Sequence, residues 1–427
     1  MAADDQDQER AVVETATTPA DTRRLTVSIF SRLRTERGQA NPFPLYAELR
    51  SKGDVFAAPW GGHIVTGFEL CDRILRNRDW LEPDAAWRER QGSGTRWGAP
   101  SSREMSKTLP ALNPPEHTRV RRSAGMFDRS TLSDLQAPIG RITTRLLDSL
   151  AERLHDGEAD LNMLVSEELP VATVGHWLGL PTADFPRLRD LTHDQVFTQE
   201  LLPSASQLAL SDAATAELRV YFTDLVRERR RRPGDDPVSR WITVWDELES
   251  DRDKADEAVY LLALFVLLAG LETTSTLLST MVLLLLQHPR QWDRLTVQPD
   301  LVPAAVEEVL RYDPPTHVIS RVASKDCVLG DTGIRKDEMV HLMVAAAHRD
   351  PAKHEEPELF NLHRKPGHLA FSGGIHYCLG APLARLEAQT LLRQLVTRFP
   401  RLTLVRQPSW APRVAFRRLL NLDVTLI

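Results

Sequence analysis

Cys378 is the residue whose surroundings most clearly favour chemistry. It lies in the segment FSGGIHYCLG, residues 371–380, directly before the helix-forming run of residues 381–389. At the amino end of a helix, the helix dipole and the free backbone N–H groups stabilise a thiolate. The glycines let the backbone approach a flat ligand and present N–H donors to the sulfur, and Phe371 would shield that sulfur from water. A buried structural thiol is the alternative for a lone cysteine, but this pattern predicts a functional thiolate.

A second segment, from about Ala258 to Gln287, is apolar on all sides. This composition is typical of a helix buried through the middle of a large protein. The alternative is a transmembrane helix. However, the midpoint has the sequence AGLETTST, residues 269–276, whose polar groups would be costly in a bilayer, and the sequence has no second span. We therefore predict a buried helix with small and polar residues at its centre.

Two further pairs of polar residues fall on single helical faces. Glu308 and Arg311 are spaced at i and i+3 and can form an ion pair. An ordinary pair on a helix surface is the alternative. His117 and Arg121 are spaced at i and i+4, so both project from one face of a predicted helix. A basic surface helix is the alternative there.

The segment 371–380 resembles the haem-binding loop of the cytochrome P-450 family and matches its F-x-x-G-x-x-x-C-x-G pattern. The other patterns occur in the family's order, and the resemblance covers the chain from about Asn41 onward. It implies a mostly α fold with small β-sheets. In that fold, haem b is buried between the long central helix and the helix after the cysteine loop. Cys378 would ligate the haem iron, and electron donation from its sulfur would favour cleavage of the O–O bond.

The resemblance places oxygen chemistry at the centre of the buried helix. Small Ala269 and Gly270 would leave room beside the iron, and a backward hydrogen bond of a hydroxyl can distort the helix there. Thr273 would stabilise the iron-bound peroxide and Glu272 would relay protons. A satisfied polar kink in the helix is the alternative for these residues.

The same resemblance assigns contacts with haem and one stabilising pair. Glu308 and Arg311, assisted by Arg364, would fix the cysteine loop. The residues expected to bind the haem propionates are His117, Arg121, Arg321 and His376, and the loop residues expected to contact the haem are Phe371, Gly374 and Gly380. Arg119 and Arg122 would point outward, where they could meet an acidic redox partner.

The implied reaction is a monooxygenation with O2 and two electrons. No phosphate-binding Gly-rich segment follows a predicted strand, and the chain ends soon after the haem loop. We therefore expect electrons from a ferredoxin, reduced by a ferredoxin reductase that uses NAD(P)H. A peroxygenase driven by hydrogen peroxide is one alternative. A non-catalytic haem sensor, or a scaffold that recruits oxygenases, is another.

Substrate identity is not encoded in the motifs, because pockets in this family are built from variable segments. Their walls are expected from residues 80–112, 184–210, 316–320 and 414–416. Val318 and Phe416 are candidate contacts with a natural product of specialised metabolism. His317 occupies a position, four before Arg321, where relatives commonly carry an apolar residue. Its partner could be a propionate, a backbone carbonyl or the substrate.

Composition sets the remaining expectations. The chain has 427 residues, a net charge of −6 with interspersed signs, and three cysteines without close spacing. These features argue against a nucleic-acid partner, a disulfide framework or a zinc site. We expect a monomer that is located in the cytoplasm and is not bound to a membrane. Residues 1–24 are expected to be a disordered acidic tail before a single catalytic domain, residues 25–427. Residues 55–58 and 63–66 are expected to form a hairpin.

Overall fold

The computed structural model describes residues 19–365 and 367–426. Its first helix, α1 (Pro19–Leu33), includes residues 19–24, which the sequence assigns to the disordered tail. Ile29, Phe30 and Leu33 are buried against α3 (Phe43–Arg50). Their helical spacing gives α1 an apolar face, and helix formation extends from this packing back to Pro19. The boundary predicted at residue 24 is corrected accordingly, and residues 1–18 of the predicted tail lie outside the described residues.

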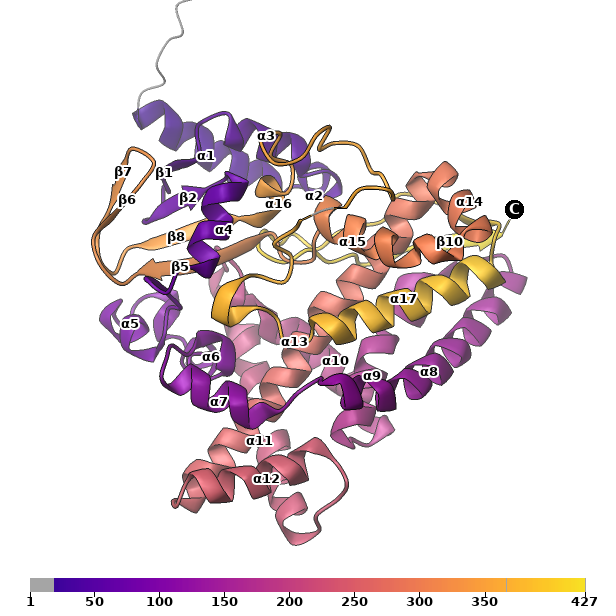
Figure 1. Ribbon diagram of the computed structural model, residues 1–427, viewed down its shortest axis with the longest axis horizontal. Helices are drawn as coiled ribbons and strands as arrows, with labels where there is room; N and C mark the ends of the chain where they lie inside the picture. The colour runs from indigo at the N-terminus through magenta and orange to yellow at the C-terminus, as the bar shows by residue number, and fades with distance from the viewer. Residues whose placement is uncertain (1–18, 366, 427) are drawn as a thin grey trace, which may run out of the picture.

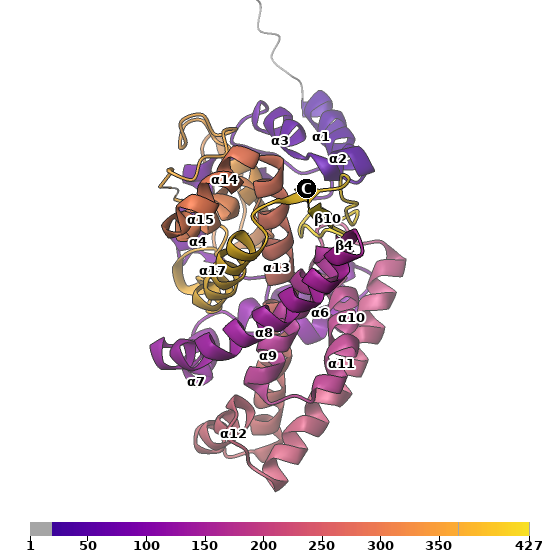
Figure 2. The same ribbon diagram turned by 90° about the vertical axis from the view of Figure 1, so that its right-hand side faces the viewer.

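Helices form most of the described chain and surround one long central helix, α13 (Arg252–Gln287), as Figures 1 and 2 show. This arrangement confirms the predicted mostly α fold with small β-sheets. The remaining α-helices are α2 (Glu36–Ala40), α4 (Phe68–Arg76), α5 (Ala85–Arg90), α6 (Pro100–Met105), α7 (Glu116–Ala124), α8 (Arg129–His155), α9 (Glu168–Leu178), α10 (Phe185–Gln195), α11 (Ala205–Arg231), α12 (Pro237–Leu248), α14 (Pro289–Val297), α15 (Val302–Tyr312), α16 (Val344–Ala347) and α17 (Ala381–Arg398).

The strands gather mainly in a five-stranded sheet of order β1-β2-β8-β5-β3. The predicted hairpin is present, with Phe56 of β1 opposite Ile64 of β2. A second sheet has the order β4-β10-β9, and β6 pairs with β7. The strands are β1 (Val55–Ala57), β2 (His63–Val65), β3 (Trp80–Leu81), β4 (Glu158–Asp160), β5 (Val318–Ala323), β6 (Cys327–Leu329), β7 (Thr332–Ile334), β8 (Met339–Met343), β9 (Leu402–Leu404) and β10 (Asp423–Leu426).

The central helix α13 is long and apolar enough to cross a membrane, yet 72% of its apolar window is buried inside the protein. It packs against α9, α11, α12 and α17. The helix starts before the predicted Ala258, because the Asp251 side chain caps it by accepting from the backbone N–H groups of Asp253 and Lys254. The buried-helix prediction is therefore confirmed. The AGLETTST segment lies at its centre, inside the molecule.

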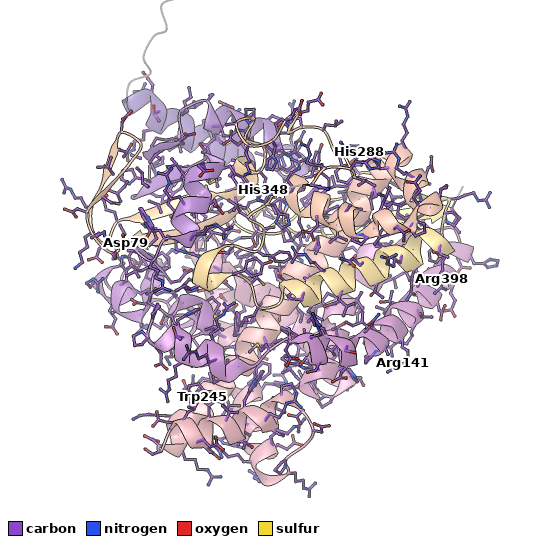
Figure 3. The ribbon with its side chains drawn as sticks, in the orientation of Figure 1. Asp79, Arg141, Trp245, His288, His348 and Arg398 are labelled. Carbon is purple, nitrogen blue, oxygen red and sulfur yellow. The ribbon has the colours of Figure 1, made fainter. Side chains whose placement is uncertain are left out.

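A buried ion pair links α15 to the approach of the cysteine loop. Arg311 Nε and NH2 each lie 2.8 Å from a carboxylate oxygen of Glu308, and Arg364 Nε lies 3.5 Å from the same carboxylate. His348, inside the molecule in Figure 3, has its ring Nδ1 3.1 Å from the Arg311 carbonyl oxygen. The other ring nitrogen of His348 accepts from the Leu369 backbone N–H at 2.7 Å. The pair is thus connected to the segment that enters the loop.

Glu387 of α17 gives the fold a testable pH dependence. Its side chain is buried, and burial raises its pKa to about 8. A carboxyl whose pKa is raised on folding binds its proton more tightly in the folded state, so stability falls as pH rises from the ordinary value of 4.5 towards 8. We expect Glu387→Gln to remove about 2–5 kcal/mol of that fall. Urea unfolding of parent and variant at both pH values measures it, with the exposed Glu152→Gln as control. Parallel pH dependence of parent and Glu387→Gln would contradict the assignment.

Candidate active site

The Cys378 sulfur lies at the amino end of α17, as the sequence predicts. The backbone N–H groups of Gly380 and Ala381 donate hydrogen bonds towards it. A Cβ added at Gly380 would lie 3.8 Å from the sulfur, an ordinary van der Waals distance. Burial raises the pKa of the thiol, while these N–H groups, Arg121 and Arg385 act in the opposite direction. The loop therefore surrounds the sulfur with donors and cations that favour an anionic ligand once a metal replaces its proton.

Both the sulfur and one face of α13 keep accessible surface inside the molecule. Cys378 is exposed although protein surrounds it closely enough to desolvate the thiol. At the centre of α13, Ala269 is exposed, and Phe265, Gly270 and Thr273 are partly exposed. Phe265, Ala269 and Thr273 recur every four positions and so share a helical face. The Thr273 hydroxyl donates to the Ala269 carbonyl at 3.0 Å, which is the predicted backward hydrogen bond.

A group of cationic and imidazole side chains lies beside the loop. Arg321 is buried, with NH1 2.6 Å from Glu82 Oε1 and NH2 3.3 Å from Ser372 Oγ. The rings of His117 and His376 have centroids 4.4 Å apart, and the buried His117 Nε2 has no hydrogen-bond partner among the described residues. Burial, and then the neighbouring positive groups, lower the pKa of His376 to about 3. This surplus of donors suits a ligand with carboxylate groups.

Arg121 and Phe371 both contact the cysteine loop. Arg121 is partly exposed and donates from NH2 to the Tyr377 carbonyl at 2.8 Å. Phe371 is buried, and its carbonyl accepts from the Cys378 N–H at 3.0 Å. The guanidinium of Arg385 lies 4.5 Å from the centre of the Phe371 ring. These contacts fix the loop around the sulfur.

Two of the glycines expected beside the haem, Gly374 and Gly270, lie close to other parts of the protein. A Cβ at Gly374, whose φ is +62°, would lie 2.6 Å from the backbone oxygen of Leu75 at the end of α4. A Cβ at Gly270 would lie 2.8 Å from Val174 Cγ2 of α9. Both distances are too short for a real side chain, so these glycines allow helix and loop packing. Gly270 is itself partly exposed next to the exposed Ala269, so the expectation that both residues leave room beside the iron stays a prediction.

Comparisons with known proteins agree with this geometry. Residues 210–410 match the family described as Cytochrome P450. The biotin biosynthesis cytochrome P450 of Bacillus subtilis is 33% identical over 398 residues, which cover 90% of this chain and 96% of that protein. The chain belongs to the cytochrome P450 family. Nocardicin C N-oxygenase of Nocardia uniformis subsp. tsuyamanensis is 33% identical over 86% of this chain and 91% of its own length.

A solved structure supports the P450 assignment at the level of fold. P450BioI in complex with hexadec-9Z-enoic acid ligated acyl carrier protein has a TM-score of 0.84 and 30% sequence identity to this chain. The match covers 92% of this chain and 99% of that chain. The protein is therefore a P450 monooxygenase, and its cofactor is a haem iron.

The residues of this P450 fit that cofactor. The accessible thiol of Cys378 would ligate the haem iron, and the exposed face of α13 at Ala269 would contact the bound cofactor. The unpartnered His117 Nε2, Arg321 and His376 would hold the propionates. Glu82, which contacts Arg321 and lies 4.0 Å from His376, is a neighbour that no motif revealed.

The proposed acid of the P450, Glu272, is buried in a network that sequence reasoning missed. Its Oε2 lies 2.6 Å from His193 Nδ1, and its Oε1 pairs with Arg413. Burial raises the pKa of Glu272, but Arg413 and His193 outweigh that effect and lower it to about 2. Arg413 stands with Arg417 and Arg418 in a terminal segment that is otherwise largely apolar. Such cations signal buried acidic partners, though not which ones.

His317 proves to have internal partners for both ring nitrogens. Its Nδ1 lies 2.7 Å from the Tyr46 hydroxyl and its Nε2 lies 3.0 Å from Asp313 Oδ1. The ring is buried, and burial lowers its pKa, so a neutral imidazole accepts from the tyrosine and donates to the carboxylate. This corrects the hypothesis that His317 hydrogen-bonds the substrate. Val318 is buried at the start of β5, and a bridge between Thr316 and Phe416 joins two predicted walls.

Replacing the sulfur tests the iron ligand. We expect Cys378→His to retain haem but lose the red-shifted absorption band of the reduced, carbon monoxide-bound protein, because that band requires a thiolate ligand. Cys71→Ser and Cys327→Ser should keep the band and serve as controls. A persistent band in Cys378→His, with loss in either control, would mean that another cysteine ligates the iron.

Replacing His317 tests its structural role. We expect His317→Leu to lower the free energy of unfolding by about 1–3 kcal/mol, because Tyr46 and Asp313 lose their buried partner. Haem content should stay unchanged. Urea unfolding measures the loss, and equal stability of variant and parent would show that these two hydrogen bonds contribute nothing to the fold.

Proposed function

We propose that this P450 inserts one oxygen atom from O2 into a small organic substrate, using protons delivered past Glu272 and Thr273. The supporting observation is the position of Thr273 on the accessible face of α13, next in sequence to the buried carboxylate of Glu272. When bound, the haem iron supplies the oxygen activation, which consumes two electrons and two protons and releases one oxygen atom as water.

The protein's own groups orient the reactants and control protons. The Thr273 hydroxyl, held at 3.0 Å from the Ala269 carbonyl, can turn to donate or accept a hydrogen bond at the accessible face. Glu272 stands one residue earlier and can return a proton to that hydroxyl when its ion pairs loosen. Apolar side chains of α13 on either side exclude bulk water, which keeps proton delivery selective.

We propose that electrons come from an acidic ferredoxin with an NAD(P)H-dependent reductase. The surface near the cysteine loop offers exposed cations for such a partner, Arg73 on α4 and Arg122 on α7. The two helices flank the loop in Figure 1. Arg119, the other outward arginine expected from sequence, pairs with Glu116 and Glu249 and is less available.

The substrate class is proposed from the relatives. Their names place them in biotin biosynthesis, polyketide biosynthesis and nocardicin formation. We propose a natural product of specialised metabolism, oxidised in the cytoplasm by a monomeric enzyme. A screen for compounds that change the haem absorption band on displacing water from the iron would identify it.

The Thr273→Ala variant tests the assigned proton route. We expect haem content and substrate affinity to stay unchanged, while product formed per NAD(P)H consumed falls roughly ten-fold because a proton-transfer group is lost. The missing electrons should appear as hydrogen peroxide and water. Thr274→Ala removes the neighbouring hydroxyl and serves as control. An unchanged ratio in Thr273→Ala would remove this residue from the mechanism.

The same assay separates the alternative functions. A monooxygenase consumes NAD(P)H in proportion to product when ferredoxin, reductase and substrate are present. A peroxygenase would form product with hydrogen peroxide and without ferredoxin. A sensor or scaffold would form no product under either condition, so each alternative gives a distinct result.

A further inference from the structure

His193 of α10 stands between two buried carboxylates. Its Nδ1 lies 2.6 Å from Glu272 Oε2, and its Nε2 lies 2.8 Å from Glu167 Oε2. Glu167 directly follows a π-helical turn, residues 162–166, and precedes α9. All three side chains are buried, so water does not satisfy the ring nitrogens in their place. The imidazole therefore joins the proposed acid of the active site to a second acid.

The hydrogen bonds determine how many protons His193, Glu167 and Glu272 hold together. A carboxylate only accepts, whereas a neutral imidazole has one donor nitrogen and one acceptor nitrogen. With carboxylates on both sides, either both nitrogens of His193 carry a proton or one carboxyl does. His317 shows the contrast, because its neighbours are one hydroxyl and one carboxylate, which a neutral ring satisfies. The His193 group thus holds one proton more than a neutral ring and two carboxylates would.

The surrounding charges place that proton on the ring. Burial opposes a charged His193, but its hydrogen bonds to Glu167 and Glu272 outweigh burial and raise the pKa of the ring. Arg413 pairs with Glu272, and this cation keeps the Glu272 carboxylate ionised. Arg413 also donates to the His193 carbonyl at 2.9 Å. Arg418 lies 3.4 Å from Glu167, and its side chain is 19% exposed. The two carboxylates thus contact the ring directly, and each is paired with an arginine of the C-terminal segment.

We propose that His193 is a positioning residue that holds the proton which Glu272 passes to Thr273. The proposal rests on the proposed function, in which those two residues deliver protons. In the step, the Nδ1–H bond of His193 breaks and an O–H bond forms at Glu272 Oε2. The ring becomes neutral as the carboxylate loses its charge, and solvent later returns one proton to the group. An ionised Glu272 without this neighbour would have no proton at hand at neutral pH.

A purely structural ion pair is the competing explanation, and two variants of His193 separate it. An asparagine amide lies near the position of Nδ1, so His193→Asn can still donate to Glu272. A glutamine amide lies near the position of Nε2, so His193→Gln can still donate to Glu167. Neither amide exchanges a proton at physiological pH. A structural role survives in at least one of the two variants, whereas a proton-holding role is lost in both.

The holoenzyme assay uses ferredoxin, reductase, NAD(P)H and substrate in H2O and D2O. In both His193 variants we expect kcat to fall roughly ten-fold or more. The solvent isotope effect should rise and the KM for substrate and the carbon monoxide spectrum should stay unchanged. The exposed His176→Asn is the matched control. Parent-like kcat and isotope effect in either His193 variant would overturn the proposal.

The Thr273→Ala variant distinguishes failure of this proposal from failure of the proposed function. If Thr273→Ala is uncoupled while a His193 variant is parent-like, only the role of His193 is wrong. If Thr273→Ala stays coupled, the proposed function is wrong as well.

Two further measurements test the proposal without replacing His193. Ring ¹⁵N shifts of His193 in the reduced, carbon monoxide-bound protein should show both nitrogens protonated at neutral pH, and a neutral ring would overturn the proposal. Glu167→Gln removes one carboxylate and leaves the contact with Glu272. The pKa of His193 should then fall, moving the alkaline loss of activity down by about one pH unit. An unmoved pH profile would also overturn the proposal.

Discussion

The buried ion pair between Glu308 and Arg311 connects α15, through His348, to the segment that leads into the cysteine loop. Arg311 donates two hydrogen bonds to the Glu308 carboxylate, which also accepts from the Asn361 backbone N–H, and Arg311 donates further to the carbonyls of His348 and Leu359. From His348, a ring nitrogen holds the backbone N–H of Leu369, two residues before the loop. Because removing one partner of a buried pair leaves an uncompensated charge, this connection constrains the whole segment that carries the sulfur.

The site places different polar groups on the two sides of the expected haem. Beside the cysteine loop, Arg321, His117 and His376 give an excess of cationic and donor groups, which suits propionates and an anionic sulfur. On the α13 side, Glu272 is ionised and enclosed by Arg413 and His193. The first group would anchor the propionates, and the second is proposed to hold protons for the oxygen chemistry. Each is costly to bury, which is why both are built as networks with several partners.

Glycine and alanine positions along α13 and the loop show how packing refines a pattern. The sequence AG at residues 269–270 indicates a need for small side chains. At Gly270 the need comes from Val174 of α9, whereas the exposed Ala269 leaves surface free on the accessible face of α13. Gly374 similarly accommodates the backbone of Leu75 in a left-handed conformation. A run of small residues in a sequence indicates that space is needed there. Only the packed structure shows which neighbouring group uses that space.

The sequence by itself determined the cysteine loop at the start of α17, the buried central helix and the helical pair at residues 308 and 311. Those features rest on local geometry: a helix amino terminus, an apolar segment without a polar face, and an i, i+3 spacing. The tertiary structure alone decided that His317 is satisfied internally, that α1 begins at Pro19, and that His193 and Arg413 enclose Glu272. His193 is 79 residues from Glu272 and Arg413 is 141 residues from it. Neither contact has a periodic or local signature, because the packing of α10 and the C-terminal segment against α13 brings these side chains together.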